Sequence, residues 1–337
     1  MHDTARWQGL VPSAEQTELT TSARRHFATR FPFDRTLFDR PRLPDWPEVL
    51  AAGYPLVGVP EPVGAGSLAD LAALLEEAGR ALLPVPLLAT AAAVQTELAA
   101  GLPVTERSVG SPSALAVAVA GRHLPVLDGV AARVVVLLVP ADGGTTLVKL
   151  TPLARESLTH VDPTRPLALV PLDGTPAETH HVESTVEELL GPARVAVAAD
   201  LVGTAAGALD LAVRHALDRE QFGRPVGAFQ AVKHRLANVY LAVERARSLT
   251  VAAALSAAPA APARDADAVV LPLLAKAAAA EAALAATDAF VQVLGAMGVT
   301  FEADAHLYFR RARQTAPYLG TPDECYRRAV ALRGGGA

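Results

Sequence analysis

Few positions in this sequence stand out as candidates for catalysis or metal binding. Cys325 is the single cysteine, which excludes an intramolecular disulfide framework and a cysteine-rich metal site. His180 and His181 are adjacent and would point to opposite sides of a strand, so they make a poor metal-binding pair. Asp323 and Glu324 are neighbouring carboxylates, but acidic residues at a helix start suit the helix dipole without any catalytic role. We therefore expect no metal site and assign no catalytic residue.

Two segments combine arginine, glutamine and glycine in a way that suits a phosphate-bearing cofactor. One is Asp218-Arg-Glu-Gln-Phe-Gly-Arg-Pro-Val-Gly-Ala-Phe-Gln230, and the other is Gln292-Val-Leu-Gly-Ala-Met-Gly-Val-Thr300. A diphosphate is bound well by guanidinium groups and by exposed backbone N–H groups. The alternative for the first segment is a plain helix end, with Gly223 as a cap and the charged side chains in solvent.

Residues 1–108 read as a helical domain. Ser13 with Gln16 is a capping-box pattern and predicts a helix to about Thr29. Ser67 with Asp70 caps a second helix, whose leucines recur at helical spacing. A third helix is expected from about Leu87.

Residues 109–186 change character and predict a small, mostly antiparallel β domain. The expected strands are short runs rich in β-branched residues, separated by glycine and proline, at 115–120, 133–139, 145–150 and 167–170.

Residues 187–337 predict a C-terminal four-helix bundle, which makes the fold class α+β. Three long helices are expected at about 192–218, 229–257 and 265–295, with a turn near 258–264 and a last helix after Pro322. Pro192 suits the first position of the first bundle helix.

The composition limits the partners and the location of the protein. With 51% hydrophobic and only 5% aromatic residues, the core must be built from Ala, Val and Leu, which suits closely packed helices. The net charge of −5 offers no basic surface for nucleic acid. No uninterrupted apolar run approaches the roughly 18–20 residues of a membrane span, and the N-terminus lacks the pattern of a signal peptide. We therefore expect a cytoplasmic protein without a membrane span.

Three segments together resemble the acyl-CoA dehydrogenase family. Val59-Pro-Glu-Pro-Val-Gly-Ala-Gly-Ser67 and the following Leu75-Glu-Glu-Ala-Gly-Arg80 are similar to the family's first loop and its Glu-Glu helix. The segment 218–230 is similar to the family's Arg-x-x-Phe-Gly…Gln junction, and 292–300 with Arg310 and Gly320-Thr321 is similar to its C-terminal ending. The order and spacing of these segments cover almost the whole chain, and the family's fold agrees with the plan read above.

The resemblance implies FAD, bound between subunits of a dimer of dimers, and α,β-dehydrogenation of an acyl-CoA thioester. It also implies roles for individual residues. The pyrophosphate and adenine of FAD would be held by Arg219, Gln221 and Phe222, with Gln230 in the same segment. The ADP part of a flavin held mainly by a neighbouring subunit would be approached by Gln292 and Gly295. The other end of a diphosphate would lie near Thr321 and Asp323, and the substrate would contact Arg194.

The general base of the family is missing. The reaction needs a carboxylate that removes the α-proton, and the family's usual Tyr-Glu-Gly-Thr reads Tyr318-Leu319-Gly320-Thr321 in this sequence. Some members carry the Glu instead at the start of the first bundle helix, where this sequence has Ala193 before Arg194. The family's Thr-Glu-Pro-x-x-Gly-Ser segment at the flavin ring is also absent, and 104–111 is its nearest remnant.

These departures predict a base-less subunit of a heteromeric acyl-CoA dehydrogenase, similar to bacterial enzymes that act on steroid side-chain CoA esters. A homologous subunit with the catalytic Glu would be its partner, with an acyl-CoA as substrate and an electron-transfer flavoprotein as a further partner. Two alternatives remain open. One is a self-sufficient flavoenzyme with altered chemistry or with Asp323 or Glu324 as a relocated base. The other is a flavin-free assembly scaffold.

Overall fold

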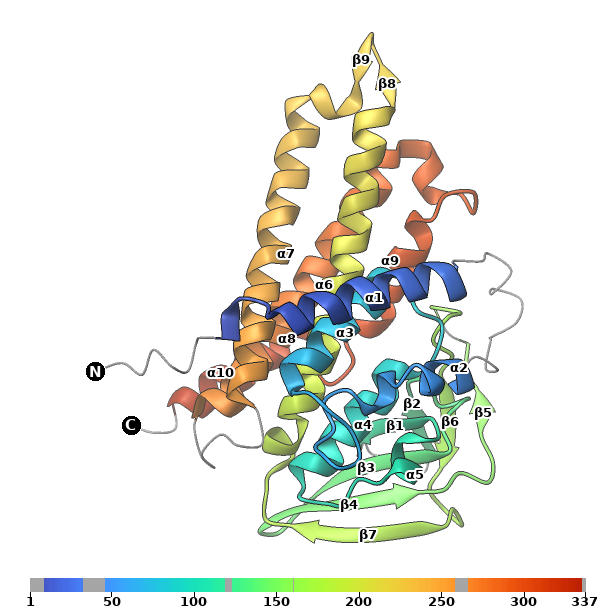
Figure 1. Cartoon of the computed structure of the whole chain (residues 1–337), viewed down its shortest axis with the longest axis vertical. Helices are drawn as coiled ribbons and strands as arrows, with labels where there is room; N and C mark the ends of the chain where they lie inside the picture. The colour runs from blue at the N-terminus through green and yellow to red at the C-terminus, as the bar shows by residue number, and fades with distance from the viewer. Residues whose placement is uncertain (1–8, 33–45, 119–122, 160, 258–265, 335–337) are drawn as a thin grey trace.

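The computed structural model describes residues 9–32, 46–118, 123–159, 161–257 and 266–334. Helices form the N-terminal part, strands form the middle, and long helices form the C-terminal part (Figure 1). This is the α+β arrangement predicted from the sequence. The predicted turn at 258–264 lies outside the described residues.

The N-terminal part begins with the helices that the capping patterns predicted. Ser13 and Ser67 each form a complete capping box, with Gln16 and Asp70 respectively. The helices are α1 (Ala14–Arg30), α2 (Trp46–Ala51), α3 (Leu68–Arg80), α4 (Leu87–Ala99) and α5 (Glu106–Val109), with a short 3-10 turn at Tyr54–Leu56.

The middle part contains two small sheets. The strands are β1 (Ser113–Val117), β2 (His123–Val126), β3 (Val134–Ala141), β4 (Gly144–Leu150), β5 (Glu156–Ser157), β6 (Ala168–Pro171) and β7 (Ala177–Val182). One sheet has the order β1-β3-β4-β7 and the other β2-β6-β5. Among the described strands of this part, β1 and β3 pair in parallel and the other neighbours are antiparallel.

The C-terminal part consists of α6 (Val186–Asp218), α7 (Gln230–Ser256), α8 (Ala266–Leu294), α9 (Ala305–Thr315) and α10 (Pro322–Gly334). A short hairpin of β8 (Glu220–Gln221) and β9 (Arg224–Pro225) joins α6 to α7 and forms the far tip of the bundle (Figure 1). The prediction that Pro192 occupies the first helical position was wrong. Thr185 and Glu188 form a capping box that starts α6 at Val186, so Pro192 lies inside the helix.

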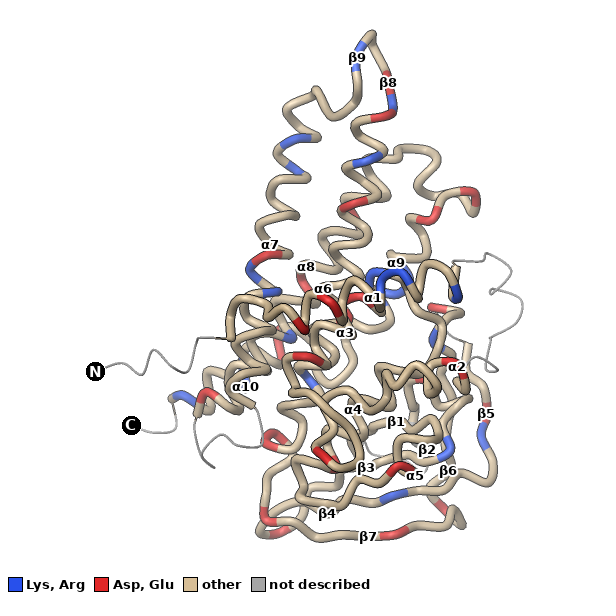
Figure 2. Tube along the Cα trace, viewed as in Figure 1, with Lys and Arg blue, Asp and Glu red and all other residues tan. Residues whose placement is uncertain are grey.

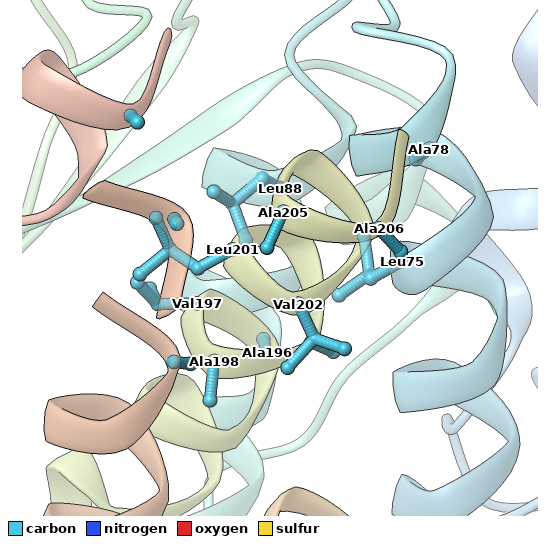
Figure 3. Packing of buried hydrophobic residues seen from close by; sticks show 14 of the residues in the cluster. Leu75, Ala78, Leu88, Ala196, Val197, Ala198, Leu201, Val202, Ala205 and Ala206 are labelled. Atoms are coloured by element: carbon cyan, nitrogen blue, oxygen red, sulfur yellow. The ribbon is translucent and has the colours of Figure 1, made fainter. Parts of the chain in front are cut away.

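Helix α6 is the centre of the molecule, and it is buried over most of its length. Its Ala, Val and Leu side chains pack against α3, α4 and α8, as Figure 3 shows around Val197, Leu201 and Val202. Small residues allow the closest approach. A Cβ on Gly79 of α3 would lie 2.0 Å from the carbonyl oxygen of Asp200, and a Cβ on Gly203 would lie 1.9 Å from that of Glu76. The two helices therefore touch backbone to backbone.

Charged residues of α3 tie this contact to the surrounding helices. Arg24 of α1 binds Glu77 through two hydrogen bonds of 2.7 Å. Arg247 of α7 binds Glu76, with its closest contact at 2.9 Å. The segment 75–80, which carries part of the family resemblance, thus serves as the joint between the N-terminal part and the bundle.

Two helices, α6 and the stretch from α8 through residue 299, are long and apolar enough to cross a membrane by length and composition alone. Their most apolar windows are 89% and 61% buried inside the fold. Burial of this kind is typical of core helices, which pass the same test.

Candidate functional site

A cavity of about 330 Å³ lies between strand β1 and the loop that follows α9. We call it the Leu319 cavity, and we call residues 316–321 the Leu319 loop. Leu115, Val117 and Pro125 line the cavity from the β domain, and Leu190 lines it from α6. Tyr318 also lines it and donates its hydroxyl to the carbonyl oxygen of Leu115 at 2.9 Å, which fastens the loop to β1. Most of the lining residues are apolar, and Glu324 and Arg328 are the charged ones.

Of the two positions at which the family carries its base, Leu319 lines this cavity and Ala193 lies in the packed interior behind it. Leu319 lines the cavity and packs against the buried cluster that contains Leu190 and Ala193. Ala193 is fully buried. Each position therefore carries an apolar side chain that cannot accept a proton.

Two buried cations hold the Leu319 loop from inside the bundle. Arg194 donates from Nε to the carbonyl oxygen of Leu319 at 3.2 Å and from Nη1 to Glu187 at 2.7 Å. Lys276 of α8 donates to the carbonyl oxygens of Ala316 and Gly320. The bonds stabilise an unusual backbone, because Leu319 has a φ of 59°, in the left-handed region.

The surroundings of Lys276 change its acidity. Burial disfavours the ammonium form and lowers the pKa of Lys276 to about 8. Sequence reasoning did not select this residue as functional. The available signal was a lysine inside an alanine-rich helix, since a buried lysine is rare without a partner.

Arg194, predicted to contact the substrate, lies beneath the cavity rather than in it. Its side chain is fully buried, and it is absent from the residues that line the cavity. The structure therefore shows Arg194 positioning the Leu319 loop, and its contact with substrate stays a prediction.

Glu324 is the carboxylate among the residues that line the cavity beside Leu319, and its side chain is hydrogen-bonded to Thr321. Its Oε2 accepts hydrogen bonds from the backbone N–H and the hydroxyl of Thr321, at 2.8 and 2.9 Å. These bonds lower the pKa of Glu324, which makes it a weaker base. Asp323 is exposed and pairs with Arg327 at 3.0 Å. Thr321 thus precedes α10 and Asp323 lies in its first turn, and their predicted role near a diphosphate stays a prediction.

The predicted FAD-binding residues of the segment 218–230 gather at the opposite end of α6. Arg219 follows the last residue of the helix, Gln221 lies in β8, and Gln230 begins α7; all three are exposed. Phe222 is 92% exposed at the hairpin turn, with a φ of 53°. Figure 2 marks residues of both charges along the hairpin.

Gln292 and Gly295 lie at the end of α8, on the same end of the bundle as the hairpin (Figure 1). Both are exposed, and Gly295 has a φ of 64°. Arg219 directly follows α6 and lies 25 residues after Arg194. This separation corresponds to about 37 Å along a helix. Within one chain, the structure therefore does not bring the hairpin residues together with Arg194, Thr321 and Asp323.

Among the described residues, no group of three or more His, Cys, Asp or Glu side chains could hold a metal ion.

Comparison with known proteins identifies the family. The family model for the acyl-CoA dehydrogenase C-terminal domain matches residues 184–335. The acyl-CoA dehydrogenase IpdE2 of Mycolicibacterium smegmatis is 35% identical over 280 residues, which cover 81% of this chain and 82% of that protein. The chain belongs to the acyl-CoA dehydrogenase family. The acyl-CoA dehydrogenase FadE34 of Mycobacterium tuberculosis is 38% identical over 313 residues, and this chain spans 42% of its length.

Solved structures of acyl-CoA dehydrogenases share the fold. The structure described as "Tcur3481-Tcur3483 steroid ACAD G363A variant" superposes with a TM-score of 0.81 at 27% identity, over 96% of this chain and 98% of that one. A glutaryl-coenzyme A dehydrogenase superposes with a TM-score of 0.80 at 20% identity, over 97% of each chain. Members of the acyl-CoA dehydrogenase family are FAD-dependent, and the fold predicted from the three segments is confirmed.

Proposed function

We propose that this chain is the base-less subunit of a heteromeric, FAD-dependent acyl-CoA dehydrogenase. The observation that carries the proposal is Leu319, an apolar side chain on the wall of the cavity at the position where the family has its usual base. Ala193, at the alternative position, packs in the cluster against which Leu319 rests. A homologous partner would supply the carboxylate that removes the α-proton of the acyl-CoA.

The hairpin end of the bundle fits the phosphate end of FAD. Arg219 presents a charged donor and Gln221 presents an amide, and both lie on an exposed hairpin whose turn has a left-handed backbone at Phe222 and Gly223. Gln292 and Gly295 would contribute from the end of α8. When bound, FAD accepts the hydride that leaves the substrate's β-carbon. Since Arg219 lies about 37 Å along the helix from Arg194, which supports the Leu319 loop of the same chain, the cofactor held at the hairpin would serve a cavity in the partner.

Exposed apolar side chains support a subunit interface at the same end of the molecule. They lie on the last turns of α6, on the hairpin, on the first half of α7 and after α8. They are Val213, Leu217, Phe222, Tyr240, Leu241, Met297, Val299 and Phe301. Obligate interfaces resemble a protein core cut in half, so an apolar surface around the hairpin fits a permanent partner.

The similar structure described as "Tcur3481-Tcur3483 steroid ACAD G363A variant" is named for two proteins, which suggests a heteromeric assembly and a steroid-like substrate for this chain. We accordingly propose a polycyclic acyl-CoA as the substrate of the complex. The apolar wall formed by Leu115, Val117 and Leu190 is compatible with an apolar acyl group.

The test is purification of this chain alone and together with a homologous chain that has Tyr-Glu-Gly-Thr intact. We expect the chain alone to be colourless and inactive, and the co-purified complex to show the flavin absorbance and dehydrogenase activity. If the chain alone carries a stoichiometric amount of FAD and is active, it is instead a self-sufficient enzyme. Co-purification without any flavin would establish an assembly scaffold.

A further inference from the structure

Five charged side chains meet in the interior where the three parts of the chain come together. Asp128 follows strand β2, while Asp162 and Arg165 precede β6; Asp200 belongs to α6, and Arg311 belongs to α9. All five are almost completely buried. We call them the junction cluster. It lies apart from the hairpin and does not line the Leu319 cavity.

Two ion pairs account for four members of the junction cluster. Arg165 binds the carboxylate of Asp200 with both terminal nitrogens, one of them at 2.9 Å, and it joins the β domain to α6. Arg311 binds Asp162 and also donates to the carbonyl oxygens of Leu82 and Leu83, at 3.2 and 3.3 Å. Each buried arginine is therefore matched to one carboxylate, and together they connect all three parts.

Asp128 is the carboxyl group that has no cation of its own. Its Oδ2 is buried and has no hydrogen-bond partner. The backbone holds the residue in place, because its φ is 54° and its carbonyl oxygen accepts from the N–H groups of Ala131 and Ala132 at 3.0 and 3.2 Å. Arg155 fixes the same turn by donating to the carbonyl oxygens of Val130 and Ala132, at 2.9 and 2.8 Å.

The groups that face Asp128 come from every element around it. Arg165 and Arg311 attract an ionised carboxylate, whereas Asp162 and Asp200 repel it. Tyr318, on the Leu319 loop, also interacts electrostatically with Asp128. Burial is the largest effect and raises the pKa of Asp128 from its ordinary value of 3.8 to about 7, although the two arginines act in the opposite direction.

We propose that Asp128 is a protonation switch for the junction of the three parts. The neutral carboxyl leaves two balanced ion pairs. The ionised carboxylate adds a third negative charge among two cations that are already paired, in a place that water does not reach. Ionisation therefore loosens the packing of the turn at 128–132 against 162–165 and α9. Tyr318 lies within reach of that charge and fastens the Leu319 loop to Leu115, so the cavity wall is loosened with the junction.

The experiment compares the full-length chain with Asp128→Asn, which keeps the shape of the neutral carboxyl and cannot ionise. The control is Asp142→Asn, which removes an exposed carboxylate from the same domain. The free energy of unfolding is measured by denaturant titration from pH 4 to pH 8. Because the pKa is raised in the folded state, the stabilising effect of the neutral form is complete below about pH 4 and is lost as the pH rises to about 7.

The interval from 3.8 to about 7 spans about three pH units. The unfolding equilibrium constant of the wild type, relative to Asp128→Asn, is expected to rise by up to about tenfold per pH unit across it. The Asp142→Asn curve should run parallel to that of the wild type. Parallel curves for the wild type and Asp128→Asn would overturn the proposal.

A second measurement serves if Asp128→Asn does not fold. Amide hydrogen exchange of the wild type, corrected for intrinsic rates, is compared at pH 5.5 and pH 7.5. Protection of 129–132 and 161–165 should fall at the higher pH, while protection of β3 and β4 should not. An equal change in all these segments, or none, would show that Asp128 is no switch.

Discussion

Arg194 of α6 donates a hydrogen bond from Nε to the carbonyl oxygen of Leu319 at 3.2 Å. This bond links the two places at which acyl-CoA dehydrogenases carry their base, because Ala193 precedes Arg194 and Leu319 occupies the usual position. Lys276 holds the same loop through Ala316 and Gly320. Two buried cations therefore hold this loop, although neither Ala193 nor Leu319 can accept a proton.

Replacing Arg194 should test this support. Arg194→Met keeps an unbranched side chain but removes the donors to Leu319 and Glu187. We expect a loss of roughly 1–3 kcal/mol in the free energy of unfolding, since a buried carbonyl oxygen is left without its partner. Denaturant titration measures the loss. The control is Arg327→Ala, which breaks an exposed pair with Asp323 and should change stability by about 0.5 kcal/mol or less. Equal effects of the two substitutions would contradict a supporting role for Arg194.

The lowered pKa of Lys276 predicts a distinctive pH dependence of the free energy of unfolding. Its pKa is lowered from 10.5 to about 8 in the folded chain, so the unfolded chain binds more protons between these values. The stability of the wild type relative to Lys276→Met should therefore rise with pH from about 8 to 10, by roughly 2 kcal/mol, and be constant below pH 8. Lys233→Met, which removes an exposed lysine of α7, should show no such difference from the wild type. A constant difference in stability between the wild type and Lys276→Met across this pH range would argue against a lowered pKa of Lys276.

Much of the fold could be predicted from local sequence signals. The capping boxes at Ser13 and Ser67 set helix starts correctly because their hydrogen bonds involve residues three apart in sequence. The wrong helix start at Pro192 also arises from a local signal, because a capping box further upstream was not used. Thr185 and Glu188 form a capping box that starts the helix at Val186, six residues before Pro192, so the helix runs through the proline.

The site was less predictable, because its parts are brought together by tertiary packing. The empty base position at Leu319 could be read from sequence, but its support by Lys276 joins residues 44 positions apart. The junction cluster is a stronger case. Arg165 and Asp200 show no shared local pattern, and their pairing becomes visible when the β domain is placed against α6. Long-range pairs of this kind leave no periodic signal in the sequence.

The glycines between α3 and α6 give a sharp packing test. Gly203→Ala would place a Cβ 1.9 Å from the carbonyl oxygen of Glu76, so the helices must separate. We expect a loss of about 3 kcal/mol or more in stability. Gly191→Ala on the same helix meets its nearest atom at 3.4 Å and gains the helix propensity of alanine, so it should be neutral or stabilising by up to about 1 kcal/mol. Thermal or denaturant unfolding would reveal the contrast, and a tolerated Gly203→Ala would refute the close approach.

Arg219 gives the most direct test of the shared cofactor. In the purified heteromer, Arg219→Ala should reduce the FAD content by tenfold or more, because a diphosphate loses its charged partner. Arg219→Ala removes an exposed side chain and keeps the backbone N–H that bonds to His215 at the end of α6, so the helix content of the variant should be unchanged. Arg245→Ala, which removes an exposed arginine paired with Glu281, serves as the control and should leave the flavin absorbance intact. Full FAD retention in Arg219→Ala would favour the scaffold alternative.

Glu324 decides between the base-less subunit and the self-sufficient enzyme. It lines the Leu319 cavity, but its carboxylate caps α10 through Thr321, and these hydrogen bonds lower its pKa. A base-less subunit predicts that Glu324→Gln changes turnover of the heteromer by less than about twofold, since proton removal occurs in the partner. Asp323→Asn should likewise have no effect, because Asp323 is exposed and paired with Arg327. If Glu324 were the base, Glu324→Gln would lower kcat by about 10²-fold or more and leave Asp323→Asn active. Steady-state kinetics with both variants, at matched FAD content, would separate the two mechanisms.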